Sequence, residues 1–162
     1  MKNIIHTLIG PDNITRKLLI GSQSFMEMFF DNYVMTNDTI LISITNPGEP
    51  MANIHETKHL HIFRMQFWDL DRDDDKLKAP DRHSFDGIKR FIDSHRNVPN
   101  IFVHCGAGIS RSAAVAWSIC DYLQLTDLEG HNFGTYATIR YIPNRRVKAL
   151  CDIALQKGET DE

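Results

Sequence analysis

The amino-acid sequence predicts an α/β fold with a mostly parallel central sheet flanked by helices. Two segments, 39–45 (TILISIT) and 101–104 (IFVH), are short apolar or β-branched runs, as expected for strands buried on both faces. The segment 111–123 (RSAAVAWSICDYL) is apolar nearly all round, which predicts a helix inside the domain. Alternation of such strands and helices is typical of a parallel sheet.

Weaker patterns predict the other elements of the first half of the chain. Segments 4–9 and 18–20 are short apolar runs that predict strands, and 59–67 alternates as a strand does. Segment 23–31 carries Phe25 and Phe29 at helical spacing, which predicts a helix.

Three further helices are predicted in the second half. The first begins at Ser84, a suitable N-cap, and its apolar spacing continues to His95. Thr126 and Glu129 have the spacing of a capping box, which predicts a second helix. The third follows Pro143 and Asn144 and contains Val147, Leu150, Cys151 and Leu155 on one face.

Length and composition limit the class of protein. The 162 residues contain no repeat, linker or long apolar run, so we expect one domain over residues 1–162 and no membrane segment. A net charge of −3 argues against nucleic acid or an anionic membrane as partner. Three cysteines without paired spacing indicate free thiols in a reducing cytoplasm. We expect a cytoplasmic monomer.

The segment 101–120 places a strand, a cysteine, a glycine-containing turn and a buried helix in immediate succession. A helix N-terminus presents unpaired N–H groups and partial positive charge, so a loop that enters it can bind an anion. Gly106 and Gly108 let the backbone curl with its N–H groups pointing inward, and Arg111 adds a fork of donors that matches phosphate oxygens. The predicted phosphate-binding residues are Gly106, Ala107, Gly108, Ile109, Ser110 and Arg111.

Cys105 lies in the same positive field, which favours the reactive thiolate. We expect Ser112 to hydrogen-bond the sulfur and ease its departure as a leaving group, and His104 to orient the loop through its backbone contacts. Alone, a cysteine here would be a small buried residue and the arginine a surface charge. The joint pattern of Cys, Gly, Arg and hydroxyl between a strand and a helix favours a nucleophile.

The stretch HCGAGISRS resembles the His-Cys-x5-Arg-Ser/Thr signature of the protein tyrosine phosphatase superfamily, with Gly108 at the glycine position of the signature. The compact, dual-specificity-like branch, which includes small bacterial and phage members, is most similar. The resemblance covers about 39–155 and includes the late Pro143-Asn144 pair. The first 38 residues contribute nothing to it.

The resemblance implies the cysteine-phosphatase fold and a phosphomonoester hydrolase that acts on phosphotyrosine, and on phosphoserine or phosphothreonine, in proteins. Cys105 would be the nucleophile and form a phosphocysteine, with Arg111 clamping the phosphate together with the loop N–H groups. An aspartic acid would protonate the leaving oxygen and then activate water. Arginine and backbone dipoles would supply the charge stabilisation, so no metal and no cofactor are implied.

The general acid is expected in WDLDRDDD, residues 68–75. Family members place it just after the strand that precedes the long helix, often behind an aromatic residue, and FWD makes Asp69 the best match. Asp69 is also nearest the strand end, where we expect it to be partly buried. Asp71 is the alternative, and the three later aspartates predict a solvated turn.

Two metal-site patterns are disfavoured by their context. The aspartates match the first positions of an EF-hand loop, but Asp74 replaces its glycine and Pro80 its final glutamate. The stretch 55–59 (HETKH) fits a zinc-protease pattern, which needs a helix and a third ligand downstream. Here it precedes a strand.

The alternatives that remain concern substrate and activity. The five residues between Cys105 and Arg111 include no lysine or arginine, which favours a monophosphate over a phosphoinositide, although a phosphoinositide or other non-protein monoester stays open. Sulfur transferases and arsenate reductases use related loops, and a catalytically silent phosphate-binding module is a further alternative. Basic residues that follow the loop would attract acidic substrates or form a solvated helix end; they are Arg140, Arg145, Arg146 and Lys148.

Overall fold

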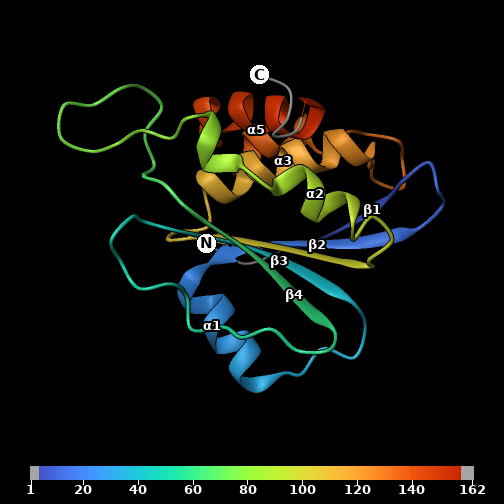
Figure 1. Cartoon of the computed structure of the whole chain (residues 1–162). Helices are drawn as coiled ribbons and strands as arrows, with labels where there is room; N and C mark the ends of the chain where they lie inside the picture. Colours follow the sequence, from blue (N-terminus) through green and yellow to red (C-terminus); the bar gives the residue numbers. More distant parts are fainter. Residues whose placement is uncertain (1–3, 158–162) are drawn as a thin grey trace.

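The computed structural model describes residues 4–157 and contains a five-stranded sheet with the order β1-β2-β5-β3-β4 (Figure 1). Strands β2, β5, β3 and β4 run parallel, and β1 pairs with β2 in the antiparallel direction. The prediction of an α/β fold with a mostly parallel sheet is confirmed. The strands are β1 (Ile5–Ile9), β2 (Thr15–Ser22), β3 (Thr39–Thr45), β4 (Leu60–Gln66) and β5 (Asn100–Cys105).

The helices lie on both faces of the sheet (Figure 1). Helix α1 covers one face, whereas α2, α3 and α5 cover the other, and the short α4 contacts α3. Their bounds are α1 (Gln23–Asn32), α2 (Ile88–Asp93), α3 (Arg111–Leu123), α4 (Gly134–Arg140) and α5 (Arg145–Lys157), with a 3₁₀ helix η1 (Arg82–Phe85) before α2.

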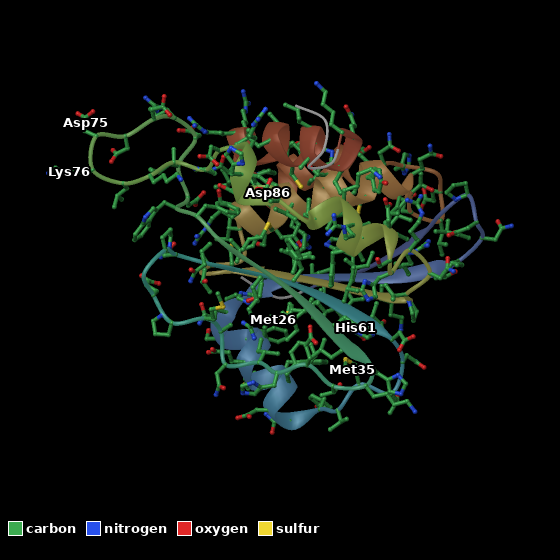
Figure 2. The ribbon with its side chains drawn as sticks, viewed as in Figure 1. Met26, Met35, His61, Asp75, Lys76 and Asp86 are labelled. Atoms are coloured by element: carbon green, nitrogen blue, oxygen red, sulfur yellow. The ribbon has the colours of Figure 1, made fainter. Side chains whose placement is uncertain are left out.

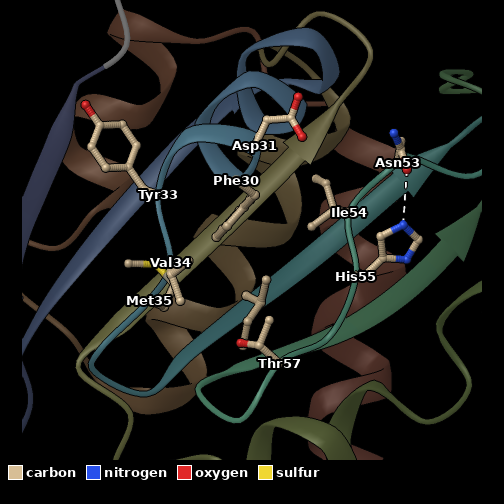
Figure 3. A pocket seen from close by; sticks show the side chains of 10 residues that line it. Phe30, Asp31, Tyr33, Val34, Met35, Asn53, Ile54, His55 and Thr57 are labelled. Carbon is tan, nitrogen blue, oxygen red and sulfur yellow. Dashed lines mark hydrogen bonds between the residues drawn. The ribbon is translucent and has the colours of Figure 1, made fainter.

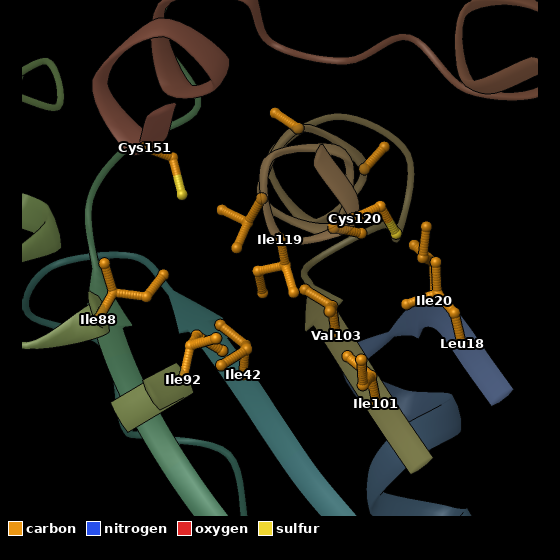
Figure 4. Packing of buried hydrophobic residues seen from close by; sticks show 14 of the residues in the cluster. Leu18, Ile20, Ile42, Ile88, Ile92, Ile101, Val103, Ile119, Cys120 and Cys151 are labelled. Atoms are coloured by element: carbon orange, nitrogen blue, oxygen red, sulfur yellow. The ribbon is translucent and has the colours of Figure 1, made fainter. Parts of the chain in front are cut away.

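Two apolar clusters hold these layers together. The larger one lies between the sheet and α2, α3 and α5, and includes Ile42, Val103 and Ile119 (Figure 4). The smaller one lies under α1 and includes Met26 and Phe102. Because alternate residues of β3 and β5 enter different clusters, both strands are buried on both faces, as their continuous apolar runs predict. Each such side chain contributes about 1.5–3 kcal/mol through burial.

Two helix predictions in the second half need correction. Ser84 is not the N-cap of a helix that runs to His95: Asp81 caps the 3₁₀ helix η1, Ser84 completes its capping box, and α2 begins at Ile88. The capping-box pattern at Thr126 does not begin a helix. The backbone of Thr126 pairs with that of Ile9, the Asp127 side chain accepts from two N–H groups of the following turn, and α4 begins only at Gly134.

The α1 face also carries a pocket of about 360 Å³ beyond the C-terminal end of α1 (Figure 3). Its lining is mainly apolar and includes Phe30, Met35 and Ile54, with Asp31 and His55 among its polar residues. None of the predicted site residues lines it. No helix within residues 4–157 has the length and apolarity that crossing a bilayer requires.

Candidate active site

Cys105 ends the central strand β5, and the loop that follows leads directly into α3. The side chain is 2% exposed, and its sulfur accepts a hydrogen bond from the Gly108 N–H at 3.3 Å. The Ser112 hydroxyl oxygen lies 3.2 Å from the same sulfur. The structure therefore places both a backbone N–H and a hydroxyl against the predicted nucleophile.

The path of the loop depends on Gly108. Its φ of +75° is rare for residues with a side chain, and a Cβ there would lie 2.4 Å from the carbonyl carbon of Gly21 on β2. The start of α1, directly after β2, also holds the loop, because the Gln23 N–H donates to the Gly106 carbonyl at 3.3 Å. The loop consequently packs against β2 with no room for a larger residue.

Arg111 lies beneath the loop and is 6% exposed. One guanidinium nitrogen, Nη1, donates to the Asn46 side-chain oxygen and to the Phe67 carbonyl, both at 2.7 Å. Nε is buried and has no hydrogen-bond partner among the described residues. Nη2 lies beside Gly106, 3.5 Å from where a Cβ of that residue would stand. Nη1 is thus held by acceptors of the protein, whereas the buried Nε has no acceptor within residues 4–157.

His104 lies behind the loop. Its Nε2 lies 2.7 Å from the Ser43 hydroxyl on the adjacent strand β3, and its Nδ1 lies 3.4 Å from the Cys105 carbonyl oxygen. Burial lowers the pKa of His104 to about 4, so the imidazole is neutral at pH 7. The side chain thus ties Cys105 to β3 without adding a charge.

The acid loop, residues 67–80, joins β4 to η1 and extends away from the body, with Asp75 and Lys76 at its tip (Figure 2). Asp69 contacts the signature loop, residues 105–111, through its Oδ1, which accepts from the Ser110 hydroxyl at 2.8 Å. The same oxygen accepts from the Asn144 amide at 2.9 Å. Asp69 is exposed, which corrects the expectation of partial burial, because these contacts lie at the rim of the site.

The other aspartates of the acid loop lie elsewhere. Asp71 contacts Arg72 at 3.4 Å, and Asp73 forms an ion pair with Arg146 at 3.0 Å. Asp74 accepts from two backbone N–H groups of its own turn. The structure therefore brings Asp69, and not Asp71, to the signature loop.

Asn144 is a residue of the site that sequence reasoning did not assign. Its Oδ1 accepts from the Val147 N–H at the start of α5, its Nδ2 donates to Asp69, and its own N–H donates to the Ser110 carbonyl at 3.2 Å. Two residues earlier, the Ile142 N–H donates to the Ile109 carbonyl at 3.2 Å. The Pro143-Asn144 pair was the available signal, since it belongs to the resemblance.

Asn46 is the second unassigned residue. It directly follows β3, and β3 pairs in parallel with β5, so the carboxyl ends of both strands meet at one edge of the sheet. A polar residue just beyond such an edge is a recognisable signal for a site.

Ala107 is exposed and has no side-chain hydrogen bond to make, so only its backbone can contribute.

Two other sequence features lie apart from this site. The HETKH stretch forms a turn before β4, in which His59 contacts Asp38 and the Glu56 carboxylate accepts the Ile62 N–H. Cys120 and Cys151 are buried in the larger apolar cluster as free thiols (Figure 4). Burial raises the pKa of Cys120, and that of Cys151 to about 12, so neither suits a thiol relay.

Solved structures similar to this chain include phosphatases and a phosphatase-like protein. Human DUSP28 has 16% sequence identity and a TM-score of 0.55, and the match covers 94% of this chain and 98% of that one. The human tyrosine phosphatase-like serine/threonine/tyrosine-interacting protein has 18% identity and a TM-score of 0.51, with 83% and 87% covered. A Leishmania major protein assigned to the protein tyrosine phosphatases has 17% identity and a TM-score of 0.50, with 94% and 98% covered.

At these identities the likeness establishes the fold, so the predicted cysteine-phosphatase fold is confirmed. No protein-family model matches the chain, and no curated protein matches it in sequence. The similarity to small bacterial and phage members stays a prediction.

Proposed function

We propose that this chain is a phosphomonoester hydrolase that acts on phosphotyrosine in proteins, with phosphoserine and phosphothreonine as further substrates, through a phosphocysteine intermediate. The observation that carries the proposal is the buried Arg111 beside Cys105. Its Nη1 is occupied by protein acceptors. Its Nε, which has no partner within residues 4–157, is a donor suited to a phosphate oxygen.

In the first step, the Cys105 sulfur attacks phosphorus and the P–O ester bond breaks. Asp69 gives its proton to the departing oxygen, and its Oδ2 is suited to this because Oδ1 is held by Ser110 and Asn144. Arg111 and the loop N–H groups stabilise the charge on the phosphoryl oxygens.

In the second step, water attacks phosphorus, Asp69 takes a proton from that water, and the P–S bond breaks. The departing thiolate accepts hydrogen bonds from the Gly108 N–H and the Ser112 hydroxyl, which lie at 3.3 and 3.2 Å from the sulfur. Inorganic phosphate leaves, and both Cys105 and Asp69 regain their starting forms.

The charges near the loop support a substrate with one phosphate group over a phosphoinositide with several. Two of the four basic residues that follow the loop are already paired: Arg146 contacts Asp73, and Lys148 contacts Asp121 at 3.0 Å and Asp152 at 2.6 Å. Such pairs leave less positive charge for additional phosphate groups.

Hydrolysis of p-nitrophenyl phosphate with a chelator present tests the proposal. We expect turnover by the wild type, loss in Cys105→Ser and Arg111→Lys, and no change in Arg145→Lys, a matched substitution of an exposed arginine. Full activity of Cys105→Ser would overturn the proposal.

A panel of phosphotyrosine peptides, phosphoserine peptides and phosphoinositides then defines the substrate class, and the Cys105→Ser variant serves as a trap. A wild type that binds orthovanadate but hydrolyses none of these substrates would identify a silent phosphate-binding module instead.

A further inference from the structure

The four residues Asn46-Pro47-Gly48-Glu49 form a tight turn directly after β3. The Glu49 N–H donates to the Asn46 carbonyl at 3.2 Å, and Gly48 has a φ of +82°. Proline second and a positive-φ glycine third define a type II turn. The turn brings its first and last side chains together, so that the Asn46 amide nitrogen lies 3.2 Å from each carboxylate oxygen of Glu49.

The other end of the Asn46 amide contacts Arg111. Its Oδ1 accepts from Arg111 Nη1 at 2.7 Å. An asparagine amide can present either its oxygen or its NH₂ group, and only the oxygen can accept from a guanidinium. Because a carboxylate only accepts, Glu49 keeps the NH₂ group on its own side and the oxygen toward Arg111.

The turn is itself fixed to the sheet by Gln66 at the end of β4. The Gln66 amide donates to the Thr45 hydroxyl at 3.1 Å and to the Glu49 carbonyl at 3.2 Å. The position of the Glu49 backbone is thus set by the ends of two strands, and its exposed side chain is held near Asn46.

The electrostatic consequence is that Arg111 is oriented without being neutralised. Within residues 4–157, no carboxylate oxygen lies within 4.0 Å of its guanidinium nitrogens, and both acceptors of Nη1 are neutral groups. The full positive charge therefore remains for a bound oxyanion, while the Glu49 charge acts one residue further away.

We propose that Glu49 and Asn46 are positioning residues for Arg111, and that the carboxylate acts only through the amide. The inference rests on the proposed phosphatase function and names two further residues of that site. Orientation of the guanidinium matters most when charge spreads over the equatorial oxygens, so kcat and orthovanadate affinity depend on this pair more than KM or affinity for inorganic phosphate does.

The test compares the effect of Glu49→Gln on kcat in the wild type and in an Asn46→Asp background, where we expect the effect to have the opposite sign. Glu49→Gln removes the charge that fixes the amide, and we expect kcat to fall by about threefold. Asn46→Asp sets two carboxylates against each other, and we expect a fall of about tenfold. In the double variant a glutamine amide faces an aspartate, so Glu49→Gln should now raise kcat by about threefold.

The readouts are kcat and KM for p-nitrophenyl phosphate, calorimetric binding of orthovanadate and inorganic phosphate, and the melting temperature of each variant. Glu129→Gln, in an exposed turn that follows the C-terminal end of α3, is the matched control and should leave all of them unchanged. An active wild type in which Glu49→Gln has no effect, or the same effect in both backgrounds, refutes the positioning role and leaves the proposed function intact. A wild type that neither hydrolyses the ester nor binds orthovanadate refutes both.

Discussion

The signature loop and the acid loop face each other across the site, yet they are held in different ways. Cys105 and Arg111 are 2% and 6% exposed and are surrounded by β2, β3 and α3. Asp69 is exposed. The acid loop is buried near its two ends, at Phe67 and Ala79, and its exposed part contacts the body through polar side chains. The phosphate-binding half is therefore part of the core, whereas the proton-donating half is attached to its surface.

The difference indicates a division of tasks. Electrostatic stabilisation of a transition state is strongest when donors are fixed before the substrate arrives, and burial in the core provides this. Proton transfer to a leaving group must accommodate alcohols of different shape, and a surface loop can adjust to them. Substitutions in the two loops should consequently fail in different ways.

The largest effect is expected for Gly108→Ala. A Cβ at this position meets the Gly21 carbonyl carbon at 2.4 Å and the backbone has a φ of +75°, so the loop or β2 must move. We expect a loss of about 3 kcal/mol or more in the free energy of unfolding, and loss of measurable turnover. Urea unfolding and p-nitrophenyl phosphate hydrolysis measure both.

Gly130→Ala is the matched control, because Gly130 also has a positive φ but a Cβ there meets no atom within 4 Å. Its cost should be limited to backbone strain of about 1 kcal/mol. Equal losses in the two variants would contradict the packing argument.

The next effect concerns the acid loop. Asp69→Asn should lower kcat by about 100-fold for substrates with poor leaving groups, because the departing oxygen then leaves unprotonated. With p-nitrophenyl phosphate, a good leaving group, the loss should be much smaller, and orthovanadate binding should be retained. Asp71→Asn, whose side chain contacts the exposed Arg72, should change none of these values. The reverse pattern would assign the acid to Asp71.

The sequence predicts the locally determined parts of this site better than the contacts between distant segments. The strand at 39–45, the helix at 111–123 and the signature loop were predicted at the correct residues, because buried apolar runs and local motifs determine them. The contacts of Asn46 and Asn144 were not predicted, since they join segments far apart in sequence. The helix predicted at Thr126 failed because a tertiary backbone pairing with Ile9 replaced a favourable local pattern.

Lowering the pH should reduce the free energy of unfolding, in part through the buried His104 next to Cys105. Burial lowers its pKa to about 4 from an ordinary value of 6.5, and burial lowers the pKa of His6 to about 4 as well. Below pH 6.5 the unfolded chain binds these protons and the folded chain does not, so stability falls as pH falls from 6.5 to 4. Each histidine contributes a slope of at most about 1.4 kcal/mol per pH unit.

His104→Gln should remove about half of that slope, whatever its effect on stability at pH 7. Urea unfolding at several pH values between 4 and 7 measures the slope directly. His83→Gln, at an exposed position, is the control and should keep the wild-type slope. An unchanged slope in His104→Gln would show that folding does not lower the pKa of His104.

Asn144 contacts both the signature loop and the acid loop, so its substitution should lower both the free energy of unfolding and kcat. Asn144→Ala removes the cap of α5 and the donor to Asp69, which we expect to cost about 1 kcal/mol in unfolding free energy and about tenfold in kcat. Asn144→Asp keeps the cap but replaces the donor with a carboxylate that repels Asp69. Stability near that of the wild type with low kcat in Asn144→Asp would separate the two roles, whereas parallel losses would show that only the cap matters.

The smallest effect should come from Arg146, which holds the outer part of the acid loop. Its Nε donates to the Pro80 carbonyl at 2.7 Å, and its Nη1 lies 3.0 Å from Asp73. The Asp73 side chain is 93% exposed, so this ion pair contributes little and is screened by salt, whereas the bond to Pro80 is partly buried. Arg146→Ala should therefore lower kcat by no more than about threefold, and Asp73→Asn should leave it unchanged at any ionic strength. If Asp73→Asn lowered kcat as much as Arg146→Ala at low salt, the ion pair between these two side chains would be what holds the acid loop. The attachment of the acid loop would then weaken as ionic strength rises, whereas that of the signature loop would not.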